Sequence, residues 1–166
     1  ANFLGICYCE LGDFQKGLVI FNEIASQDNP KYAEDVVKAK ENIKLYTNNR
    51  IAKLQGENDF DGIIAVADEM LAVNPQDALA QKIRLQALFD KKDYAGVIAS
   101  AEEAAAGQTD EEERSDVYFI LGAAYNARTM PQQAIDALSK VTAGANVAAA
   151  QKTVAQLKEN AAKANS

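Results

Sequence analysis

The chain has 166 residues, of which 48% are apolar and 25% charged, a composition typical of one soluble globular domain. Its 17 basic and 24 acidic side chains leave a net charge of −7, which disfavours binding to nucleic-acid phosphates. No uninterrupted apolar stretch approaches the roughly 18 residues of a membrane-spanning helix, so such a helix is excluded, and general nucleic-acid binding is not expected.

Alanine, the best helix former, makes up nearly a fifth of the chain, whereas tryptophan is absent. No segment alternates Val, Ile, Thr and aromatic residues as strands do. We therefore expect an all-α fold and treat residues 1–166 as a single domain. The helices predicted from apolar periodicity and turn residues span about 1–11, 14–26, 31–57, 60–72, 76–90, 93–106, 110–128, 131–141 and 146–163.

A short turn phrase recurs between pairs of these helices. Its copies are Gly12-Asp13-Phe14, Asn58-Asp59-Phe60, Lys92-Asp93-Tyr94 and, in degenerate form, Thr129-Met130-Pro131. The second and third copies are 34 residues apart, and the other intervals are 46 and 37 residues. We expect each Asp to cap the following helix, and Gly12 and Asn58 to adopt the left-handed conformation that ends the preceding one.

The sequence around the turns is also shared. Before the first and last turns, Leu4-Gly5-x-x-Tyr8 matches Leu121-Gly122-x-x-Tyr125. Asn29-Pro30 and Asn74-Pro75 are expected to open the next helices, with Asn as the cap. This pattern resembles the tetratricopeptide repeat family, whose motif is Leu-Gly-x-x-Tyr, then Ala-x-x-x-Phe, then Pro, on a 34-residue period.

The resemblance implies an α–α superhelix, or solenoid, of about four helical hairpins, with repeats at about 1–30, 31–74, 75–109 and 110–142. Residues 146–163 are expected to form a C-terminal capping helix with an apolar stripe of Val147, Ala150, Val154, Leu157 and Ala161. The middle repeats depart from the family pattern, because they carry Ile51 and Leu85 in place of its glycine.

The second repeat is 12 residues longer than the family period. No Gly or Pro interrupts 31–55, which favours one long helix, but the apolar phase slips near Asn48, which leaves a kink or a break open. Because residues 31–57 carry a net charge of +2, two interpretations stay open. They form either a solvated protruding helix or a docking surface for a partner.

Two further features concern the chain's acidic run and its start. Thr109 followed by Glu112 predicts a capping box for the helix at 110–128 rather than a metal or catalytic carboxylate cluster. Only three residues precede Leu4-Gly5, so we expect more repeats or a targeting segment upstream. The compartment, cytoplasmic or periplasmic, therefore stays open.

Cys7 and Cys9 are too few for a disulfide scaffold, and a spacing of two places them on different helix faces. Half of a metal site is an alternative interpretation, but no second pair and no histidine follow. We expect free thiols that are buried or line a groove.

In tetratricopeptide proteins, the first helix of each hairpin lines a concave groove that holds a peptide or a partner helix. The resemblance maps this groove onto Asn2, Ile6, Cys9, Asn48, Ala52, Gln55, Lys82, Gln86, Phe89, Phe119, Ala123 and Asn126. Amides can bond to an extended peptide backbone, and Phe89 and Phe119 can anchor it, although both aromatics and Ile6 also suit the core between helices. Lys82 is the one cation in this set, so a clamp for peptide C-terminal carboxylates is not expected.

The sequence thus predicts a non-catalytic scaffold that binds a protein or peptide. The alternative is a structural or assembly segment of a larger multi-repeat protein that stacks or self-associates through its N-terminal face. An enzyme is not expected, because the chain has no histidine and no Gly-rich phosphate loop. No cofactor and no metal are expected.

Overall fold

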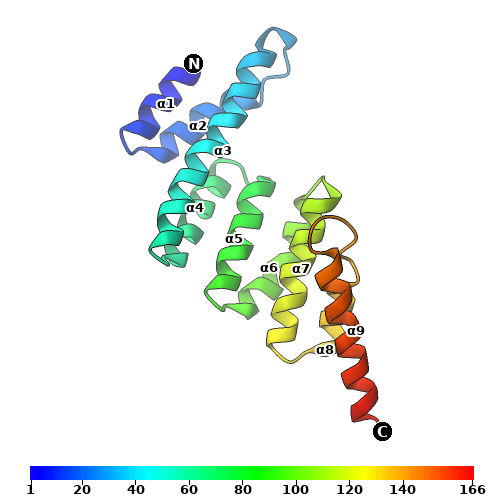
Figure 1. The fold of residues 1–166 in the computed structure, drawn as a ribbon. Helices are drawn as coiled ribbons and strands as arrows, with labels where there is room; N and C mark the ends of the chain where they lie inside the picture. The colour runs from blue at the N-terminus through cyan, green and yellow to red at the C-terminus, as the bar shows by residue number, and fades with distance from the viewer. The chain divides into compact units, whose positions relative to one another are not determined.

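The structure is a computed structural model that describes residues 1–166, and it is built from helices without strands (Figure 1). Its elements are α1 (Asn2–Glu10), α2 (Phe14–Ala25), the short 3₁₀ helix η1 (Pro30–Tyr32), α3 (Ala33–Gly56), α4 (Phe60–Val73), α5 (Ala78–Asp90), α6 (Tyr94–Gly107), α7 (Glu111–Ala127), α8 (Pro131–Leu138) and α9 (Val147–Ala164). The expected all-α class is confirmed, and every predicted helix is present.

The helices form two compact units, Ala1–Ala80 and Gln81–Ser166, and the boundary falls inside α5. In the first unit, α1 packs against α2, both contact α3, and α3 pairs with α4. In the second unit, α7 packs against both α6 and α8, and α9 packs against α8. Side chains that are at most 2% exposed form the core of each unit: Leu18, Phe21, Val66 and Met70 in the first, and Leu85, Val97, Val117 and Leu121 in the second.

All four hairpin turns share one backbone conformation. Each contains one residue with a positive φ between 54° and 87°, namely Gly12, Asn58, Lys92 and Thr129. The next residue in each turn donates its N–H to a carbonyl five positions back, over 2.8 to 3.0 Å. The left-handed conformation expected at Gly12 and Asn58 is confirmed, and the other two turns adopt it without glycine or asparagine.

The second helix of each hairpin begins as the turn phrase predicts. Asp13, Asp59 and Asp93 accept hydrogen bonds from backbone N–H groups three positions on, over 3.2, 2.9 and 2.9 Å. In the fourth hairpin Met130 makes no side-chain cap, and Pro131 occupies the first helical turn, where no N–H donor is needed.

The long segment of the second repeat is one continuous α-helix of 24 residues, α3, preceded by η1. Asn29 caps η1 by accepting from the Lys31 N–H over 3.0 Å, as expected. The phase slip does not break the helix, because Thr47 takes a core position there. It is fully buried, and its hydroxyl lies 3.8 Å from the Met70 sulfur.

Two predicted helix caps are wrong by one to three residues. Asp110, not Thr109, caps α7, because its carboxylate reaches two free N–H groups, those of Glu112 (2.9 Å) and Glu113 (3.1 Å). Asn74 accepts from the Gln76 N–H within a turn. The helix begins later, at Ala78, and the Asp77 carboxylate accepts from the Ala80 N–H over 3.1 Å.

The helix α9 closes the second unit over the end of α8. Leu138, Val141 and Ala150 form a buried cluster there. The loop before α9 is fixed by the buried Ser115 of α7, whose hydroxyl accepts from the backbone N–H groups of Thr142 and Ala143 at 3.1 Å each. Of the predicted apolar stripe, Ala150 is buried, Val147, Val154 and Leu157 are half-buried, and Ala161 is exposed.

Candidate functional site

Half of the predicted groove residues lie in the first unit, on two helices. Asn2, Ile6 and Cys9 are half-buried on α1, whereas Asn48, Ala52 and Gln55 are exposed on α3. The structure thus presents the α3 residues to solvent, and it packs the α1 residues between helices.

The α1 residues make contacts inside the unit. The Asn2 amide donates to the Asp35 carbonyl over 3.0 Å and accepts from the Asn42 amide over 3.4 Å, which ties α1 to α3. The Cys9 sulfur lies against Gly17 of α2, leaving no room for a Cβ there. Burial, followed by the neighbouring Glu10 carboxylate, raises the pKa of Cys9, so this free thiol stays protonated at neutral pH.

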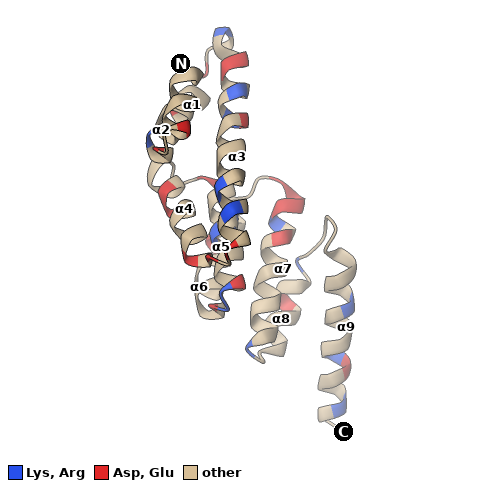
Figure 2. Cartoon of the chain, turned by 60° about the vertical axis from the view of Figure 1, so that its left-hand side comes forward, with Lys and Arg blue, Asp and Glu red and all other residues tan.

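The α3 residues belong to a longer exposed row. At spacings of three and four, one face of α3 presents Val37, Glu41, Leu45, Asn48, Ala52 and Gln55, all exposed. We call these six residues the α3 face. A helix of 24 residues is about 36 Å long, and acidic and basic side chains follow one another along it in Figure 2.

Polar groups of the α3 face are free to bind. The amides of Asn48 and Gln55 have no hydrogen-bond partner within the chain, and Val37 and Leu45 are 55% and 53% exposed. Free amides offer both donors and acceptors, and the exposed aliphatic side chains offer apolar contact area. The α3 face therefore offers both hydrogen-bonding and apolar groups to solvent along several turns.

In the second unit, Lys82 of α5 is held by two carboxylates of α7. Its ammonium lies 2.7 Å from Asp116 and also contacts Glu113. Burial lowers the pKa of Lys82, but the hydrogen bonds to Asp116 and Glu113 outweigh it, and the net shift is upward. Asn146 donates to the second oxygen of Asp116 over 2.9 Å. The two carboxylates balance the positive charge of Lys82, and this side chain thus has a structural role in joining α5 to α7.

The remaining predicted residues of this unit differ in exposure. Gln86 is exposed and donates to Asp90 one turn later over 2.9 Å. Phe89 packs edge-on against Tyr94, with ring centroids 5.5 Å apart. Phe119 packs against the cluster under α9. Ala123 is half-buried, and Asn126 is exposed.

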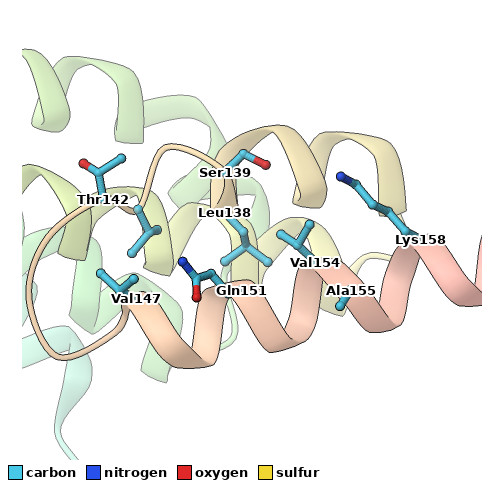
Figure 3. A pocket seen from close by; sticks show the side chains of 9 residues that line it. Leu138, Ser139, Thr142, Val147, Gln151, Val154, Ala155 and Lys158 are labelled. Atoms are coloured by element: carbon cyan, nitrogen blue, oxygen red, sulfur yellow. The ribbon is translucent and has the colours of Figure 1, made fainter.

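A groove that the sequence did not predict lies between the end of α8 and α9 (Figure 3). It has a volume of about 530 Å³, and its lining residues are Leu138, Ser139, Val141, Thr142, Val147, Gln151, Val154, Ala155 and Lys158. Gln151 and Lys158 have no partner within the chain, so the groove combines an apolar floor with one free amide and one free cation. The sequence did contain a signal for this groove. Four of its lining residues recur at spacings of three and four, on one face of α9: Val147, Gln151, Val154 and Lys158.

Comparison with known proteins finds no matching family model, no matching curated protein and no matching solved structure. Nowhere in the structure do three or more His, Cys, Asp or Glu side chains form a group that could hold a metal ion. None of its helices combines the length and the apolar character needed to cross a bilayer.

Proposed function

We propose that the chain is a non-catalytic protein–protein interaction module that binds a peptide or a partner helix on the exposed sides of its hairpins. The proposal includes tetratricopeptide-like stacking of these hairpins. The four identical turns and the packing of α1 and α2 on α3, and of α6 on α7, support it within each unit.

The observation that carries this proposal is the α3 face. Its amides are unpaired and its aliphatic side chains are exposed along an unbroken helix, which suits a polypeptide that follows the helix axis. A surface of this mixed character favours micromolar affinity, equivalent to about −8 kcal/mol.

Catalysis is a weaker proposal for this chain. Histidine is absent, the Cys9 thiol has a raised pKa, and Lys82 is neutralised by two carboxylates. Nucleophilic catalysis needs the opposite, a thiol or amine with a lowered pKa or a general base beside it.

Selection of peptides from a random display library on the purified chain tests the proposal, with affinities measured by fluorescence polarisation. The double variant Asn48→Ala, Gln55→Ala should lower the affinity for the selected peptides at least about 10-fold, which is the equivalent of two lost hydrogen bonds. Asn49→Ala is the matched control, because Asn49 is an exposed asparagine of the same helix outside the α3 face. Equal effects of the two changes would contradict the proposal.

A second candidate function is assembly through the N-terminal face. Phe3 and Leu11, at either end of α1, are 76% and 83% exposed, and such apolar exposure is typical of an interface. Light scattering over a dilution series tests self-association, and a concentration-independent monomer would argue against it.

A further inference from the structure

The groove between the end of α8 and α9 lies where α8 ends early. This helix has 8 residues, whereas the second helices of the other three hairpins, α2, α4 and α6, have 12, 14 and 14. Three residues that follow the helix, Ser139, Val141 and Thr142, line the groove beside α9 (Figure 3). Its volume of about 530 Å³ is in the range of small-molecule sites, about 300–1,000 Å³.

The walls of this groove are fixed by hydrogen bonds. Ser115 of α7 accepts from the backbone N–H of Thr142 over 3.1 Å, and the Thr142 hydroxyl donates to Glu111 over 2.8 Å. At the start of α9, Asn146 donates to Asp116 over 2.9 Å. The groove is therefore formed before a ligand arrives, which lowers the ordering cost of binding.

Lys158 is the one charged residue that lines the groove, although the chain as a whole carries a net charge of −7. The neighbouring carboxylate of Glu159 is engaged by Lys163 at 2.6 Å. The hydroxyl hydrogens of Ser139 and Thr142 are bonded to acceptors within the chain. The lining thus offers a free ammonium without a competing carboxylate, which favours an anionic group on the ligand.

The rest of the groove is largely apolar. Its floor contains the buried Leu138 and Val141 and the half-buried Val154, and Val147 lies at the end opposite Lys158 (Figure 3). Between Val147 and Lys158, α9 makes about three turns, or about 16 Å. A ligand that fills this length needs an apolar body with one anionic end.

An acyl chain suits this floor better than a polypeptide does. A peptide carries backbone N–H and C=O groups, and each one left unpaired against an apolar floor weakens binding. Besides Lys158, the Gln151 amide is the one side-chain donor of the lining that is left free. We propose that the groove binds a free medium-chain fatty acid, with the acyl chain along Val141 and Val154 and the carboxylate on Lys158. This site shares no residue with the α3 face and does not depend on self-association.

Calorimetric titration of the full chain with decanoate, below the concentration at which it forms micelles, tests the proposal. Decanoate should bind saturably and at least about 5-fold tighter than decanol, which has the same chain without the charge. Octanoate is two methylenes shorter and should bind about 5- to 10-fold weaker than decanoate. Backbone amide NMR shifts caused by decanoate should cluster in residues 138–142 and 147–158. Shifts confined to other segments would overturn the proposal.

Four variants at exposed positions of α9 separate the charge from the cavity. Lys158→Gln should weaken decanoate at least about 5-fold and leave decanol unchanged, because it removes the positive charge. Lys152→Gln is its matched control, since Lys152 lies outside the lining. Ala155→Gln places a larger side chain in the groove and should weaken both ligands at least about 5-fold. Its control is Ala149→Gln, also outside the lining, and circular dichroism shows that each variant is folded.

Three results would contradict this assignment. Equal binding of decanoate and decanol, or equal effects of Lys158→Gln and Lys152→Gln, would exclude recognition of the carboxylate. Equal effects of Ala155→Gln and Ala149→Gln would exclude the groove as the site. Tighter binding by a short apolar peptide with a free C-terminus, acetyl-Leu-Val-Leu, than by decanoate would exclude the acyl chain as the preferred ligand.

Discussion

The ring of Phe21 in α2 lies directly on Gly5 of α1, where a Cβ would come within 2.5 Å of the aromatic carbons. The last hairpin repeats this relationship, with Leu138 on Gly122. In the two middle hairpins, the first helix has a large residue at the position of the glycine, and the second helix has a small residue at the position of Phe21. The corresponding pairs are Ile51 with Ala67, and Leu85 with Ala101, and both alanines are fully buried. Each hairpin therefore fills one space between its two helices, with the large side chain on one or the other.

The first prediction exchanges the sizes in the first hairpin. Gly5→Ile alone should lower the free energy of unfolding by about 1–3 kcal/mol through overpacking, and Phe21→Ala alone by about 3–5 kcal/mol through the cavity it leaves. The double variant imitates the second hairpin. It should lose at least about 1 kcal/mol less than the sum of the single losses, because each change relieves the other. Urea denaturation measures all three variants.

Gly56 provides the control for this series, since nothing lies within 4 Å of a Cβ placed there. Gly56→Ala should leave stability unchanged or raise it by up to about 1 kcal/mol, as a better helix former. If the free energy of unfolding lost in the double variant equals the sum of the two single losses, Gly5 and Phe21 do not share one space.

The second prediction concerns Thr129, a β-branched residue with a φ of 59° in the last turn. The left-handed conformation costs non-glycine residues about 1–2 kcal/mol. Thr129→Gly should therefore raise the free energy of unfolding by about 0.5–1 kcal/mol, after the larger backbone entropy of an unfolded glycine is subtracted. Gly12→Ala, at the corresponding turn with a φ of 87°, should have the opposite sign. Thermal unfolding of both variants checks the pair, and a destabilising Thr129→Gly would contradict the turn argument.

The hairpins were predictable because local signals specify them. Turn residues such as Gly12 and Asp13, and apolar periodicity, act over a few positions, and the structure has the helices within a few residues of their expected ends. Cap positions were less certain, because Thr109 and Asp110 are both good capping residues. Which one reaches the free N–H groups depends on backbone geometry that the sequence does not state.

The candidate site was harder to predict because its residues depend on distant partners. Asn2 is engaged by Asn42, 40 positions away, and Lys82 by Asp116, 34 positions away. A repeat pattern places such side chains on a helix face, but it does not say which neighbour binds them. These contacts left free the exposed α3 residues, Asn48 among them, and Asn126 of α7.

The third prediction concerns Ser115, whose hydroxyl accepts from two backbone N–H groups of the loop before α9. Ser115→Ala leaves both donors without this acceptor, which should cost about 1–3 kcal/mol. Because the loop positions α9, trypsin should then cut faster at Lys152 and Lys158. Ser139→Ala is the control, since that serine is exposed and bonds only to its own helix. Equal cutting rates in both variants would contradict the role of Ser115.

The fourth prediction concerns Tyr46 of α3, whose hydroxyl donates to the Glu10 carboxylate over 2.7 Å. This hydrogen bond, together with burial and the negative charge of Glu10, raises the pKa of Tyr46 from 10.0 to about 12. Since the folded state favours the protonated phenol, the contact stabilises the fold below the ordinary pKa, and this stabilisation is lost as the pH rises toward about 12.

Absorbance at the tyrosinate band, followed through an alkaline titration, should show an ionisation step near pH 12 that belongs to Tyr46. Tyr46→Phe should remove that step. Glu10→Gln should move it back toward the ordinary value, because a neutral amide no longer penalises the phenolate. Glu23→Gln removes the same charge from an exposed position on α2 and should leave the late step in place. A late step that survives Glu10→Gln would mean that α1 and α3 do not meet through this pair.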